Sequence, residues 1–144
     1  MSKLQFILKR VFVVAIILFV ASLTVYHLIP CPGKTTRQFF LHLKYERYEE
    51  AYGLTDGIYR ENRGPFERFR REYYDAVRSG TRTRRVFING IQRTDQPDHY
   101  IVHVTVRVLY RGDLLDTQGS YLLRNVSGKG WRIVQNVSNI VQRP

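Results

Sequence analysis

An uninterrupted apolar run near the N-terminus constrains this chain more than any other feature. Val11 to Ile29 holds nineteen residues without an Asp, Glu, Lys or Arg. At about 1.5 Å per residue, a helix of this length spans roughly 28 Å, close to the thickness of the hydrocarbon core of a bilayer. A helix buried in a soluble domain is usually shorter and carries a polar stripe. Residues 11–29 are therefore predicted to form a transmembrane helix.

The flanks of this run favour an uncleaved signal-anchor over a removable signal peptide. A basic tail, residues 1–10, precedes it, as both kinds of segment require. The run is longer than a signal core of about 7–15 residues, and no small-x-small cleavage motif follows it. A lipoprotein is the other alternative, because Cys31 follows the run. However, Pro30 stands where lipid attachment calls for a small residue.

Basic residues also set the expected orientation. The tail contains Lys3, Lys9 and Arg10 and no acidic residue, so the positive-inside rule places it in the cytoplasm and exports the rest of the chain. Lys34 and Arg37 follow the run closely, which leaves the reverse orientation as the alternative.

Residues 36–144 are long enough for one domain with a single modest core. All 12 acidic residues and 20 of the 23 Lys and Arg residues lie beyond the apolar run, so this part carries a formal charge of about +8. The single cysteine excludes an intrachain disulfide. Four scattered histidines show no ligand spacing, so we expect neither metal nor cofactor.

Three short helices are predicted at the start of the domain. Two prolines and a glycine make residues 30–35 a short, stiff linker, after which Thr35 or Thr36 offers an N-cap oxygen. Helical spacing of apolar residues continues to Thr55, and a third helix opens at Pro65. We expect Ile58 to Arg63 to be a loop or a single helical turn.

The apolar period changes to two from Thr81 onward, which predicts strands. The clearest alternation places one set of side chains on a single face: Tyr100, Val102, Val104, Val106, Val108 and Tyr110. Turn residues separate four such segments, as in an antiparallel meander. Helices followed by a run of strands indicate an α+β fold, with helices packed on one face of a curved sheet of about four strands.

Several segments resemble the nuclear-transport-factor-2-like family. The similarity lies in the Phe-Leu helix and Tyr-x-x-Ala-Tyr-x-Leu-Thr segment of residues 40–55, in Phe66-x-x-Phe69 with Tyr73, and in the Gly-Trp-Arg-Ile-Val strand at 130–134. The resemblance implies a cone, in which a strongly curved sheet wraps over helices and often leaves a cavity at the open end. It does not imply a function, because this fold hosts enzymes, binding modules and assembly proteins alike.

Aromatic residues of the helices and the last strand could line such a cavity or simply form the core. The candidates are Phe40, Tyr48, Tyr52, Phe66, Phe69, Tyr73 and Trp131. Acid–base catalysis would need a carboxylate or imidazole in an apolar pocket. His103 alternates with the valine stripe and is expected on the other face of the strand, so we expect no catalytic residue.

Arginines are concentrated in the middle of the chain. Nine lie between residues 60 and 85, against four acidic residues: Arg60, Arg63, Arg68, Arg70, Arg71, Arg78, Arg82, Arg84 and Arg85. Pairing along a helix accounts for some of them and leaves a surplus of about five. Nucleic acid is not an expected partner of a tethered, exported domain. Anionic lipid or an acidic protein surface suits this surplus better.

The sequence therefore predicts a non-enzymatic, single-pass membrane protein. Its basic α+β domain would dock on a membrane protein complex or an anionic membrane surface, as an accessory or assembly subunit. The alternative is a membrane-tethered binder of a small apolar ligand in the cone cavity, with an enzyme as its less favoured variant.

Overall fold

The computed structural model describes residues 2–28 and 31–138, in two compact units that divide after Pro30. The first unit is a single helix, α1 (Lys3–Leu28). Its stretch Lys3–Val25 is long and apolar enough to cross a membrane by length and composition. The predicted end of the span at Ile29 lies outside the described residues.

The second unit begins with helix α2 (Pro32–Lys44), earlier than predicted. Cys31 occupies the N-cap position and Pro32 the first turn, where its fixed φ angle suits a helix and its missing N–H is not needed. Thr36 does not cap the helix; its hydroxyl donates to the carbonyl of Pro32 at 2.9 Å. Residues 32–35 are therefore helical rather than linker.

Three more helices complete the helical layer: α3 (Tyr48–Gly53), α4 (Gly57–Arg63) and α5 (Phe66–Arg78). Helix α4 occupies a segment that was predicted as a loop or one turn. The Asp56 carboxylate caps it by accepting from the N–H of Gly57 at 2.8 Å. Only Tyr59 is buried from this helix, so no apolar period marked it in the sequence.

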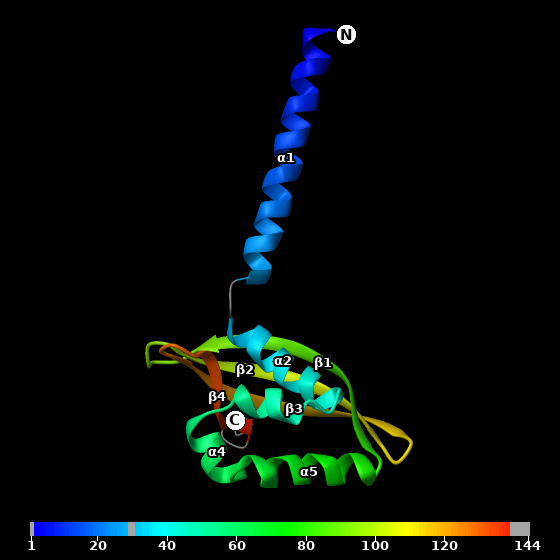
Figure 1. Cartoon of the computed structure of the whole chain (residues 1–144), viewed down its shortest axis with the longest axis vertical. Helices are drawn as coiled ribbons and strands as arrows, with labels where there is room; N and C mark the ends of the chain where they lie inside the picture. Colours follow the sequence, from blue (N-terminus) through cyan, green and yellow to red (C-terminus); the bar gives the residue numbers. More distant parts are fainter. Residues whose placement is uncertain (1, 29–30, 139–144) are drawn as a thin grey trace. The chain divides into compact units, whose positions relative to one another are not determined.

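The strands form one antiparallel sheet in the order β1-β2-β3-β4, as predicted. Their bounds are β1 (Thr81–Arg93), β2 (His99–Tyr110), β3 (Asp113–Val126) and β4 (Gly130–Asn136). The helices lie on one face of this curved sheet (Figure 1). Val102, Val104 and Val106 of β2 face them and are at most 8% exposed, which confirms the predicted alternation and the α+β class.

Aromatic side chains of the helices make most of the contact with the sheet. Phe39 of α2 and Phe69 of α5 are almost fully buried, and they lie against Leu123 and Ile133 in one core. The segment between α3 and α4 is fixed to the last strand, because the backbone of Ile133 bonds Leu54 and Asp56 at 2.8 Å each. This pairing closes one end of the space between helices and sheet.

Candidate functional site

A cavity of about 430 Å³ lies between the helices and the sheet, away from the β4 attachment. Helices α2 and α5 and the start of α3 form one side, and β1, β2, β3 and the end of β4 form the other. The valine stripe of β2 forms part of its wall, through Val104, Val106 and Val108. Phe40 and Tyr121 also line it, with their rings edge to face at 5.6 Å.

The cavity also has a polar lining. Lys44, Glu46 and Arg82 contribute charged groups and are exposed residues, and uncharged polar groups come from Thr81, Thr83, Thr117, Gln118, Asn136 and Ser138. Burial raises the pKa of Tyr121 to about 12, so its hydroxyl is neutral at physiological pH. The site can therefore receive an apolar group, with charged side chains within reach of solvent.

Tyr48, at the start of α3, is the unusual polar residue of the cavity. It is 9% exposed, and its hydroxyl is buried without a well-formed hydrogen bond among the described residues. Burial raises the pKa of Tyr48, and the nearby Glu46 carboxylate raises it further through its charge and a weak hydrogen bond. Because an unpaired buried hydroxyl costs stability, this group is a candidate hydrogen-bond donor to a ligand.

The structure brings together only some of the predicted cavity residues. Phe40, Tyr48 and Tyr73 line the cavity, whereas Tyr52, Phe66, Phe69 and Trp131 do not. The ring of Phe69 packs instead against Phe39, Tyr52 and Tyr73, and Trp131 lies edge-on to Tyr100 at 5.4 Å. Sequence reasoning missed the contribution of β3, whose alternation around Gly119 and Tyr121 gives the signal that could have found it.

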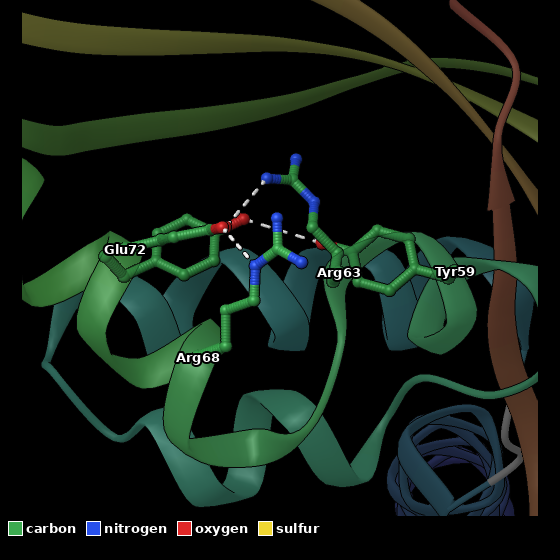
Figure 2. A network of polar contacts seen from close by, with 5 residues as sticks. Tyr59, Arg63, Arg68 and Glu72 are labelled. Carbon is green, nitrogen blue, oxygen red and sulfur yellow. Dashed lines mark hydrogen bonds and ion pairs between the residues drawn. The ribbon is translucent and has the colours of Figure 1, made fainter.

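A polar cluster joins α4 to α5 beside the core (Figure 2). The Tyr59 hydroxyl lies 3.5 Å from that of Tyr73, and burial strongly raises the pKa of Tyr59. Glu72 pairs with Arg63 at 3.5 Å and with Arg68 at 3.2 Å. These two arginines therefore have partners within the domain.

Two more of the nine arginines have internal partners. Arg60 donates to the hydroxyl of Thr55 at 3.2 Å and to the carbonyl of Tyr52 at 3.1 Å, with its guanidinium 4.5 Å from the centre of the Tyr52 ring. Arg70 lies 3.9 Å from Glu67 in a loose, exposed ion pair. Arg60 holds α4 against α3, so it is not available to a partner.

The other five arginines are exposed and form no ion pair among the residues that the structure describes: Arg71, Arg78, Arg82, Arg84 and Arg85. All except Arg71 lie where α5 ends and β1 begins. The β2–β3 turn joins them there, because the N–H of Arg111 donates to the carbonyl of Gly80 at 3.3 Å. We call Arg78, Arg82, Arg84, Arg85 and Arg111 the basic end.

The histidines of the sheet have ordinary hydrogen bonds. His103 lies on the face opposite the valine stripe, with Nδ1 2.8 Å from the Ser120 hydroxyl and Nε2 3.3 Å from the Gln92 amide oxygen. The Nδ1 atom of His99 lies 2.7 Å from the carbonyl of Pro97. Within residues 2–28 and 31–138, no three His, Cys, Asp or Glu residues are grouped as metal ligands.

Comparison with known proteins finds similarity in structure only. No family model matches the chain, and no curated protein matches it. Two similar solved structures are Nostoc punctiforme proteins of unknown function with a cystatin-like fold. One has 15% identity and a TM-score of 0.49, with 69% of this chain and 68% of that chain covered. The other has 17% identity and a TM-score of 0.46, with 72% and 83% covered.

A third similar structure is the intermembrane space region of the chloroplast protein ARC6. It has 11% identity and a TM-score of 0.46, with 75% of this chain and 96% of that chain covered. The α+β class of this protein rests on its own helices and sheet, and no function follows from these similarities.

Proposed function

We propose that this protein is a non-enzymatic, single-pass membrane protein whose domain docks through its basic end on an acidic surface. The partner is an anionic membrane surface or another membrane protein, which the domain serves as an accessory or assembly subunit. The observation that carries the proposal is the division of the arginines. Those of α4 and the start of α5 form hydrogen bonds or ion pairs inside the domain, whereas those at the basic end form no ion pair among the described residues, and only Arg78 and Arg111 lie near a tyrosine ring.

Unpaired arginines close to one another repel, so an acidic surface that meets them gains favourable contacts. Arginine also suits such contacts, because its planar guanidinium binds carboxylates and phosphates through two hydrogen bonds at once. Basic residues on an edge strand such as β1 also discourage strand addition. That role does not account for Arg78 on α5 or Arg111 in the β2–β3 turn.

A membrane anchor makes weak charge contacts sufficient. With α1 in the bilayer, the domain would meet a partner in the same membrane at a high effective concentration. Individually modest contacts from exposed arginines would then hold the domain in place. They would also make docking sensitive to salt.

Charge reversal tests the proposal on the full-length chain. We expect Arg82→Glu with Arg84→Glu to weaken the affinity of docking at least ten-fold. Docking is measured by binding to anionic nanodiscs and by capture of a stoichiometric partner after detergent extraction. Arg93→Glu with Arg124→Glu is the matched control, because both residues are exposed at the other end of the sheet and the net charge changes equally. Equal docking by the two double variants, or no docking by the wild-type chain, would contradict the proposal.

A second candidate function is supported by one specific observation, the unpaired hydroxyl of Tyr48 in the cavity. It would suit a small, mainly apolar ligand with a single oxygen that accepts this hydrogen bond. Native mass spectrometry of the full-length chain extracted from membranes would then show an adduct that Tyr48→Phe weakens. The control is Tyr45→Phe, at an exposed tyrosine outside the cavity lining. No adduct on the wild-type chain would exclude this candidate.

A further inference from the structure

The turn between β2 and β3 exposes more apolar surface than the rest of the sheet. Leu114 is 62% exposed, Leu115 is 49% exposed and Tyr110 is 40% exposed. The turn is tight, with positive φ angles of 48° at Arg111 and 90° at Gly112. Since the two leucines are consecutive on a strand, they point to opposite faces and together surround the tip with apolar side chains.

Basic side chains lie next to this tip. The guanidinium of Arg111 lies 5.3 Å from the centre of the Tyr110 ring. Arg82 is paired in register with Leu109, and the N–H of Arg111 bonds Gly80 at the end of α5. Asp113 and Asp116 flank the two leucines, and Asp116 is paired with Arg107 at 2.9 Å.

We infer that the β2–β3 turn inserts Leu114 and Leu115 into an anionic lipid bilayer while the basic end contacts the headgroups. This inference rests on the proposed function and names the lipid bilayer as its acidic partner. Leucines favour the acyl boundary, tyrosine favours the interface, and basic residues are attracted to anionic headgroups. Apolar, aromatic and basic side chains thus lie together at this turn.

The shape of the tip favours lipid over a protein partner. A protein would have to present a groove shaped to receive two leucines on opposite faces of one strand. A fluid bilayer adapts to any convex tip. The candidate span in α1 is consistent with a bilayer as the partner.

Fluorescence quenching by brominated acyl chains tests insertion in the full-length chain reconstituted in nanodiscs. We expect the indole of Leu114→Trp to be quenched at least two-fold more in anionic phosphatidylserine nanodiscs than in neutral phosphatidylcholine ones. Ile58→Trp is the matched control, because Ile58 is 47% exposed on α4, away from the tip. Because Trp131 also fluoresces, its signal and its quenching are measured in the wild-type chain and subtracted.

A second variant keeps the test independent of the added indole. Leu114→Glu with Leu115→Glu changes only exposed side chains, so the domain should stay folded and lose protection of the turn from hydrogen exchange on anionic nanodiscs. Equal quenching of Leu114→Trp and Ile58→Trp on anionic nanodiscs would overturn insertion. In that case, loss of a stoichiometric membrane protein from the captured complex on charge reversal at Arg82 and Arg84 would support docking on a protein partner. If charge reversal removed neither a protein partner nor nanodisc binding, docking and insertion would both be wrong.

Discussion

The two ends of the domain use the same residue types in opposite ways. At the closed end, where α4, α5 and β4 meet, arginine and tyrosine side chains find partners inside the domain, as Arg60 does with Thr55 and Tyr59 with Tyr73. At the open end, which comprises the cavity and the basic end, the Tyr48 hydroxyl has no well-formed hydrogen bond, and the guanidinium groups of Arg82 and Arg84 form no ion pair among the described residues.

The difference separates groups that stabilise the fold from groups available for binding. A buried or paired polar group has its desolvation cost met within the domain, so its loss is felt as lower stability. An unpaired group adds little stability, and its value lies in what it contacts outside. The closed end should therefore respond to mutation through unfolding, and the open end through association.

The largest contrast between the two ends is expected for truncated apolar side chains. Phe69→Ala should lower the free energy of unfolding by about 3–5 kcal/mol, because Phe69 is fully buried among aromatic rings. Leu114→Ala at the exposed turn should change it by no more than about 0.5 kcal/mol. Urea unfolding of the full-length chain in nanodiscs, followed by Trp131 fluorescence, measures both. Similar losses in the two variants would remove the contrast.

Alkaline pH should lower the free energy of unfolding through Tyr121, which lines the cavity. Burial raises the pKa of Tyr121 to about 12, above the value near 10 of an unfolded chain. As pH rises, the unfolded chain ionises first, so stability is full below pH 10 and falls between about pH 10 and pH 12. The Tyr121 contribution should be on the order of 2–3 kcal/mol, and Tyr121→Phe should reduce the loss in a urea-unfolding series over that pH range by this amount, while the contribution of Tyr59, whose pKa burial also raises, remains. A slope unchanged by the substitution would assign it to other groups.

Substitution of single arginines should also lower the free energy of unfolding more at the closed end than at the open end, by a smaller amount than the apolar truncations. Arg60→Ala removes two charge-assisted hydrogen bonds and a contact with the Tyr52 ring, and should cost about 2 kcal/mol of stability. Arg84→Ala should cost less than about 0.5 kcal/mol. The same urea titration measures both variants. A loss for Arg84→Ala as large as that for Arg60→Ala would mean that the basic end has a structural role.

The smallest predicted contrast concerns two tyrosine hydroxyls. Tyr59→Phe removes the hydroxyl that lies near Tyr73 and should cost about 0.5–1 kcal/mol. Tyr48→Phe removes an unpaired buried hydroxyl, so stability should stay the same or rise. Thermal unfolding of the two variants and the wild-type chain shows which of the three is the most stable. A clear loss in Tyr48→Phe would show that this hydroxyl has a partner within the domain.

Local periodicity was enough to predict most of the fold. The alternation in β2 and the apolar stripe that begins at Phe66 each depend on one element facing one core, so the α+β order followed from the sequence. Helix α4 was missed because Tyr59 alone marks its buried face. The start of α2 was placed too late because Pro32 was interpreted as part of a linker, although proline suits a first helical turn.

The candidate site was less predictable, because it depends on contacts between distant segments. Whether Phe69 lines a cavity or fills the core is decided by Phe39, thirty residues earlier in the chain. Whether an arginine forms an ion pair also depends on residues distant in sequence, since Arg63 of α4 pairs with Glu72 of α5. The sequence showed an excess of arginines, but that Arg78, Arg82, Arg84 and Arg85 lie at one end of the domain required the fold.

Hydrogen exchange of the wild-type chain in its native membrane, compared with the chain in detergent, tests the central claim most directly. The account predicts that the membrane slows exchange of amides at residues 78–85 and 110–115, while those of residues 57–69 exchange equally in both environments. Equal exchange throughout the domain, or slowing confined to residues 57–69, would show that the basic end is not where this protein meets its partner.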